Sequence, residues 1–249
     1  MKKKFLLLGC LTLTIACQST LATPKVESTP TTAAHIPPAP ATATLTFTPP
    51  PTVAAPPTPV PLFFTEEFNT DLGAWASFQT GGAQSPTVKL ENDFLRVDFS
   101  SPNTWYYAIH NAHEYSNIFI SAKFSGTPSG SLGLICDYSE SNGWYEFNLA
   151  SDGIYSVLFG QWLAAGIAQY TPIATDTTEY LQAGSLDHEI GLTCQKNILL
   201  LHINGKLFRK LDVTRYGLTE GRIGINAASF DETPMIATFD WVKVNEPGE

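Results

Sequence analysis

The sequence predicts an all-β fold, a β-sandwich or jelly roll, for residues 62–249. Short runs of alternating or continuous apolar residues, rich in β-branched and aromatic side chains, recur along this part of the chain. Asn-Gly or Asp-Gly dipeptides at 142–143, 152–153 and 204–205 separate neighbouring runs, and such dipeptides are the strongest short-range signal for a β-hairpin. No segment keeps a 3.6-residue apolar period over three turns. Many short strands separated by turns are typical of sandwiches and jelly rolls.

The apolar runs give the expected strands in order. They span residues 94–100, 117–126, 131–139, 144–150, 153–160, 187–195, 197–203, 221–229 and 235–244. A region of about 188 residues is long enough to bury one sizeable core. We therefore expect a single β domain.

Residues 1–16 predict a lipoprotein signal peptide. Three lysines precede an apolar run that ends at Ala16 and is too short to span a bilayer. The run closes in LTIAC, which resembles the lipobox of bacterial lipoproteins, where cleavage before the cysteine leaves a thiol that carries lipid. We expect lipidation at Cys17. Cleavage at Cys10 and an ordinary signal peptide cut near TLAT are the alternatives.

Residues 17–61 predict a disordered tether. After Cys17, this block contains twelve Pro, eleven Thr and eight Ala among 44 residues, so it lacks the bulky apolar side chains needed to offset chain entropy. In polyproline II geometry, at ~3.1 Å per residue, its contour length is on the order of 130 Å. The expected location is the bacterial cell envelope, with the domain attached to the membrane only through the N-terminal lipid.

The charge of the folded part excludes some partners. Without Lys2, Lys3, Lys4, Lys25 and Glu27, ten basic residues remain against 22 acidic ones, a formal net charge of −12. Nucleic acid and anionic lipid headgroups are therefore poor partners. Neutral sugars, cations and basic surfaces remain compatible with this charge. The sequence does not indicate an oligomeric state.

Several phrases occur in an order that resembles a known group of domains. The chain reads FFTEEFNTDLGAW, then GLICDY followed by NGWYEFNLASDGIYSV, then HINGKLFRKLDV and GRIGINAASFDETPMIATFDWVKV. Over residues 62–246 this resembles the concanavalin A-like (laminin-G-like) domains of bacterial envelope proteins, most of all the group labelled 3-keto-disaccharide hydrolase or DUF1080-like. The resemblance implies a jelly-roll sandwich of two curved sheets, one of them concave. A family label does not establish hydrolysis by this chain.

Cys136 and Cys194 are the cysteines that remain in the mature domain. An exported compartment permits a disulfide, and similar domains often carry a cysteine at both places, which fits a bond between neighbouring strands. Two unpaired buried thiols are the alternative. Metal binding by these cysteines is not expected, because no histidine lies at ligand spacing from either.

No catalytic motif is recognisable. Glycoside hydrolysis needs two carboxylates at a working separation, yet E-x-D-x-E is absent, and the adjacent pairs at 66–67 and 231–232 point to opposite faces of a strand. G-x-S-x-G and H-E-x-x-H are absent too. His110 and His113 form one pair near a strand end and are expected to be solvated. A non-catalytic domain is therefore favoured over an enzyme.

Aromatic and polar side chains suggest a sugar-binding face. Sugars offer an apolar face for aromatic rings and hydroxyls for carboxylates and amides. In 144–150, the alternation places Tyr145 and Phe147 in the core. Trp144, Glu146 and Asn148 then point to the outer face of the sheet. The same alternation in 131–139 adds the Asp137 carboxylate to that outer face. The predicted ligand-binding residues are Asp137, Trp144, Glu146, Asn148, Trp162 and Trp105.

A structural Ca²⁺ site is a further hypothesis. Sandwich modules often bind this ion through carboxylates and backbone carbonyls. Glu66 or Glu67 on the first strand and Asp240 on the last strand would meet if the terminal strands pair, and Glu67 with Asp240 is the predicted pair. Unpaired surface charges are the alternative, and no other cofactor is expected.

Three functions fit these observations. The leading hypothesis is a surface-tethered, non-catalytic module that recognises a glycan or cell-wall polysaccharide. The second is a glycan-processing enzyme of the 3-keto-disaccharide type, and the third is a structural or adhesion domain that binds protein partners. Exposed aromatic rings beside amides would favour the recognition module. Two converging carboxylates would favour the enzyme, and fully buried aromatic rings would favour the structural or adhesion domain.

Overall fold

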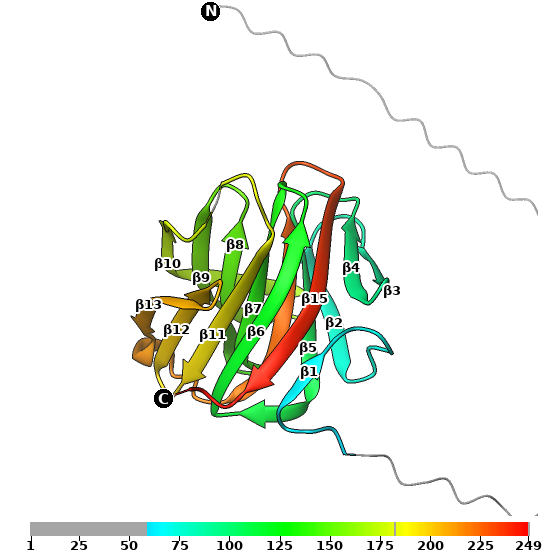
Figure 1. Ribbon diagram of the computed structural model, residues 1–249. Coiled ribbons are helices and arrows are strands. Elements are labelled where there is room, and N and C mark those ends of the chain that lie inside the picture. The colour runs from blue at the N-terminus through cyan, green and yellow to red at the C-terminus, as the bar shows by residue number, and fades with distance from the viewer. Residues whose placement is uncertain (1–58, 182, 249) are drawn as a thin grey trace, which may run out of the picture. The chain divides into compact units, whose positions relative to one another are not determined.

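The computed structural model describes residues 59–181 and 183–248, which form two packed antiparallel sheets (Figure 1). The all-β prediction is confirmed. The eight-stranded sheet has the order β13 (Lys206–Asp212), β12 (Ile198–Ile203), β11 (His188–Gln195), β6 (Asn117–Gly126), β15 (Met235–Asn245), β4 (Phe94–Phe99) and β3 (Thr87–Glu91), and β1 (Phe64–Glu66) also pairs with β15. The seven-stranded sheet has the order β10 (Ile167–Thr177), β9 (Ile154–Ala164), β8 (Gly143–Ala150), β7 (Gly130–Ser139), β14 (Gly221–Ser229), β5 (Thr104–Tyr115) and β2 (Trp75–Gly81).

All strand pairs of the described residues lie within one compact unit, Pro56–Glu249. The nine predicted strands are present as β4, β6, β7, β8, β9, β11, β12, β14 and β15. Four of the strands without a sequence prediction, β2, β3, β10 and β13, form the edges of the two sheets. Edge strands pack against fewer neighbours, so their apolar pattern is weaker than that of central strands.

The three glycine-containing turns form the predicted hairpins. They join β7 to β8, β8 to β9, and β12 to β13. Asn204 and Gly205 have φ values of 49° and 75°, the left-handed backbone that a two-residue hairpin turn requires. Local sequence therefore determines these three strand pairings.

The main core lies between the two sheets. On β8, Tyr145, Phe147 and Leu149 point inward and are fully buried. The predicted disulfide between Cys136 and Cys194 is confirmed, with 6.5 Å between the Cα atoms. Cys136 is on β7 and Cys194 on β11, so the bond joins the two sheets rather than side-by-side strands of one sheet.

Two histidines of β5 stabilise the start of the domain. His110 is buried, with its ring centroid 4.5 Å from Phe64 and 5.1 Å from Trp75. Burial, together with the nearby His113, lowers the pKa of His110 to about 4. His113 is half-buried rather than solvated, and its Nε2 lies 2.8 Å from the Val60 carbonyl oxygen. Both rings therefore have a packing role.

The signal peptide at 1–16, Cys17 and all but the last three residues of the 17–61 tether lie outside the described residues. Their assignments stay predictions. Within residues 59–181 and 183–248, no helix is both long and apolar enough to cross a membrane.

Candidate functional site

A second aromatic cluster covers the outer face of the seven-stranded sheet, away from the main core. The alternation predicted for β8 is correct, because Trp144, Glu146 and Asn148 all lie on this face. We call the following residues the outer aromatic cluster: Phe78, Trp105, Tyr107, Ile109, Ile135, Tyr138, Trp144, Trp162, Ala168 and Tyr170.

Trp144 is sealed within this cluster and is 0% exposed. The rings of Phe78, Trp162 and Tyr170 lie 6.2, 5.3 and 6.2 Å from its indole. Thr80 on β2 and Tyr170 on β10 share a hydrogen bond of 2.9 Å, although these strands are opposite edges of the same sheet. The sheet therefore curls until its edges meet over Trp144. The prediction that this indole is accessible is wrong.

Glu146 is also fully buried and holds a polar network beneath the rings. Trp144 Nε1 donates to its Oε1 at 2.6 Å, and the Nδ2 atoms of Asn148 and Asn226 each donate to its Oε2 at 3.1 Å. Burial raises the pKa of Glu146, and hydrogen bonding by Trp144, Asn148 and Tyr107 acts in the opposite direction. Gly133 leaves room for both amides, because a Cβ there would lie 2.1 Å from Asn148 Oδ1. Glu146 and Asn148 thus face outward but are covered.

Asp137 does not join this network, so its predicted position beside Glu146 is wrong. A β-bulge shifts the β7–β8 register between Cys136 and Ser139, and Asp137 takes a φ of 52°. The extra residue turns Tyr138 onto the outer face, where the alternation had placed Asp137. Asp137 is itself 3% exposed. Burial, and then the charge of Glu220, raise its pKa to about 7.

This raised pKa predicts a pH-dependent stability. The unfolded carboxyl ionises near pH 4, whereas folded Asp137 keeps its proton until about pH 7, so its contribution to stability falls as the pH rises between these values. On going from pH 4.5 to pH 7.5, we expect the stability of Asp137→Asn to rise relative to the wild type by roughly 3 kcal/mol, at about 1.4 kcal/mol per unit of pKa difference. Urea denaturation at both pH values measures this. Asparagine tolerates the same left-handed backbone as Asp137. A difference in unfolding free energy between the two proteins that is the same at both pH values would contradict the raised pKa of Asp137.

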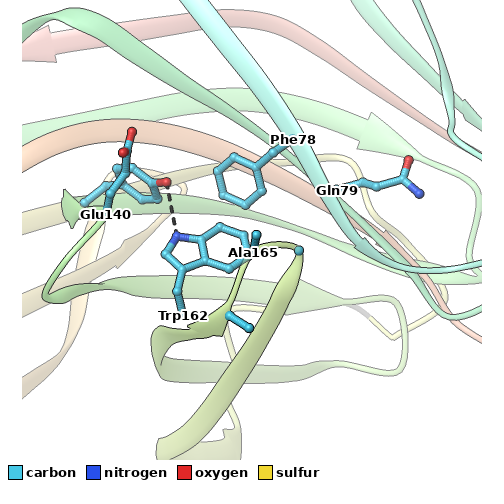
Figure 2. Close-up of a pocket in the computed structure, with 8 residues that line it drawn as sticks. Phe78, Gln79, Glu140, Trp162 and Ala165 are labelled. Carbon is cyan, nitrogen blue, oxygen red and sulfur yellow. Dashed lines mark hydrogen bonds between the residues drawn. The ribbon is translucent and has the colours of Figure 1, made fainter.

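A pocket of about 470 Å³ opens at one end of the outer aromatic cluster (Figure 2). Trp162, near the end of β9, faces Phe78 on β2 with 5.0 Å between ring centroids. Trp162 Nε1 donates to the Tyr138 hydroxyl at 3.4 Å. Gln79 and Glu140 complete the polar lining, and the β9–β10 turn at 164–166 forms one wall.

The pocket combines the half-buried rings of Phe78 and Trp162 with polar groups. Glu140 is exposed and pairs with Arg222, whose Nη2 lies 3.2 Å from its Oε1. The Arg222 guanidinium also lies over the Tyr138 ring, 5.0 Å from its centroid. This contact orients the guanidinium and the ring relative to each other. Glu140 is the one carboxylate among the described residues that line this pocket. The arrangement suits stacking and hydrogen bonding more than chemistry that needs two acids.

The remaining predicted residues lie elsewhere. Trp105 is half-buried and stacks on Tyr170 at 6.4 Å, but it does not line the pocket. The terminal strands β1 and β15 pair as expected, yet Glu67 and Asp240 line different hollows. Among the described residues, no group of three or more His, Cys, Asp and Glu side chains is placed to hold a metal ion.

Sequence reasoning found Trp162 but missed Phe78, Gln79 and Glu140. Phe78 and Gln79 belong to β2, an edge strand that was not predicted. The sequence signal was an aromatic residue among small and polar neighbours in WASFQTGG. This local pattern carries no information about the contact between β2 and the β9–β10 hairpin.

Solved structures share this fold at low sequence identity. A β-glucanase of Bacillus licheniformis has a TM-score of 0.52 at 13% identity, covering 74% of this chain and 98% of its own. A protein of unknown function with a galectin-like fold from Bacillus subtilis has a TM-score of 0.53 at 14% identity, and the match covers 74% of this chain and 94% of that protein. A glycoside hydrolase family 16 endo-glucanase from Bacteroides ovatus has a TM-score of 0.52 at 12% identity, and the match covers 73% of this chain and 99% of that enzyme. These likenesses show a concanavalin A-like jelly-roll sandwich.

Neither a protein-family model nor a curated protein matches this sequence.

Proposed function

We propose that this chain is a non-catalytic carbohydrate-recognition module, held at the bacterial cell envelope by lipid on Cys17 and a Pro/Thr-rich tether. The observation that carries the proposal is the pocket lined by Trp162 and Phe78, whose rings contact each other and form one aromatic wall. Its rings offer an apolar surface to the CH face of a sugar, and Glu140, Gln79 and the Tyr138 hydroxyl offer hydrogen bonds to the rim. The pocket volume is within the usual range for small-ligand sites.

The buried part of the outer aromatic cluster acts behind the pocket. Trp144 packs against both Trp162 and Phe78, and Glu146 fixes the Trp144 indole through its 2.6 Å hydrogen bond. A rigid ring loses little conformational entropy when a sugar stacks on it. Trp144, Glu146 and Asn148 therefore serve as positioning residues, while Trp162 is the residue that we expect to touch the sugar.

The related folds agree with a carbohydrate ligand. Two of the similar structures are named as glucanases, so we choose β-glucan tetrasaccharides as the first probes. Hydrolysis is the less favoured alternative. Glu140 is the single carboxylate of the described pocket lining, and Glu146 is closed to solvent and bonded to three donors.

The test is calorimetric titration of the 56–249 fragment with laminaritetraose and cellotetraose. This fragment contains every strand pair and the core. We expect saturable binding of at least one tetrasaccharide, and we expect Trp162→Ala to weaken it about tenfold or more, a loss of about 1.4 kcal/mol.

Leu163→Ala is the matched control. Leu163 adjoins Trp162 on the same strand, is 62% exposed and does not line the pocket, so its removal should leave affinity unchanged. Equal binding by Trp162→Ala and the wild type would place the sugar elsewhere. A lack of binding to both tetrasaccharides and to a wider glycan array would favour the protein-binding alternative.

A further inference from the structure

A second groove crosses the outer face of the eight-stranded sheet, on the opposite side of the sandwich from the Trp162 pocket. Its volume is about 530 Å³, which is again within the range of ligand sites. Its lining comes from β15, β6, β11 and β1, which lie side by side in the sheet (Figure 1), and from Glu67, which directly follows β1.

Strand alternation brings the lining together. On β15, Val242 and Val244 point into the core and are fully buried, so Trp241, Lys243 and Asn245 point outward. Lys243 and Asn245 lie opposite Ser121 and Phe119 on β6. Four strands thus present one continuous row of side chains to the groove.

The floor of the groove is aromatic. Phe119 lies over Gly191 of β11, where a Cβ would be 2.8 Å from the ring. Glycine at this position lets the ring lie close to the sheet. His202 packs against the ring of Phe119 edge-on, at 5.3 Å between centroids. Phe119 and Trp241 are both half-buried, so part of each ring remains available.

The rim of the groove is charged. Glu67, Glu189 and Lys243 line it, and within residues 59–181 and 183–248 none of them forms a salt bridge. Two carboxylates against one ammonium make the groove negative, as is the folded domain as a whole. A ligand with positive charge is therefore favoured.

We propose that this groove binds a glycan that carries free amino groups. The rings of Trp241 and Phe119 match the CH faces of sugar units, Glu67 and Glu189 match ammonium groups, and Asn245 and Lys243 match hydroxyls. This groove lies on a different sheet from the Trp162 pocket, so the two binding sites can be tested independently.

The test is titration of the 56–249 fragment with the glucosamine hexamer and, for comparison, the N-acetylglucosamine hexamer at low salt. We expect the amino form to bind at least about tenfold more tightly, because acetylation removes its charge. Trp241→Ala and Glu67→Gln/Glu189→Gln should each weaken the amino form about tenfold or more. Trp162→Ala should not affect it.

The control for general charge is Glu114→Gln/Glu179→Gln. Both residues are exposed and away from the groove lining, so this variant loses the same charge without changing the site. Equal weakening by the control, or unchanged binding in both groove variants, would overturn the proposal. Tighter binding of hexalysine than of the glucosamine hexamer at the same residues would also overturn it in favour of a basic peptide.

Discussion

Removing the disulfide by the double substitution Cys136→Ala/Cys194→Ala is expected to lower the free energy of unfolding by about 4 kcal/mol. The bond closes a loop between residues 58 apart in the sequence. In the chain-entropy model, losing a cross-link of this span restores freedom to the unfolded chain worth on the order of 4 kcal/mol. Because the bond joins β7 to β11, its loss also removes the disulfide cross-link between the two sheets.

Urea denaturation of oxidised wild type, reduced wild type and the double variant measures this effect. Both cysteines are buried, so the wild type has to be reduced in its unfolded state before the comparison. Reduced wild type and the double variant should unfold at similar, lower urea concentrations. A double variant as stable as the oxidised protein would contradict the expectation.

Glu146→Ala is expected to cost about 3 kcal/mol of unfolding free energy. The substitution leaves three buried donors, on Trp144, Asn148 and Asn226, without their acceptor. Each buried donor without a partner costs about 1–3 kcal/mol. Part of this sum is offset, because the variant no longer buries a carboxyl group whose own desolvation is unfavourable.

The measurement is again urea denaturation, followed by tryptophan fluorescence, to which Trp144 contributes as one of five tryptophans. Glu179→Ala is the control, since Glu179 is exposed and surface substitutions of this kind usually change stability by less than about 0.5 kcal/mol. Equal stability of the two variants would mean that the network contributes nothing to the fold. A loss confined to Glu146→Ala would show that the network stabilises the fold.

Local patterns predicted much of the architecture. Alternation along 144–150 assigned Tyr145 and Phe147 to the main core, and Asn204-Gly205 determined a hairpin. Both signals depend on residues within a few positions of one another. The disulfide pairing also followed from the few cysteines of the domain and the resemblance, but that it joins the two sheets did not.

The candidate site was less predictable. Alternation stated correctly that Trp144 and Glu146 leave the main core, but it does not report what covers the outer face. The bulge at Asp137 shows a second limit, because one extra residue exchanges the faces of Asp137 and Tyr138. Phe78 was missed because its edge strand has a weak pattern and its partner Trp162 is 84 residues away in the sequence.

By itself, the sequence determined the strand-rich class, the hairpins and the inward side chains of the central strands, because these follow from backbone stereochemistry and short-range periodicity. Only the tertiary structure decided which outward side chains remain exposed. That outcome depends on the curl of the seven-stranded sheet, which brings Thr80 and Tyr170 from opposite edges into hydrogen-bond contact. The closure buries Trp144 and leaves Trp162 at the opening, since accessibility is a property of long-range packing and not of a residue's place in a strand.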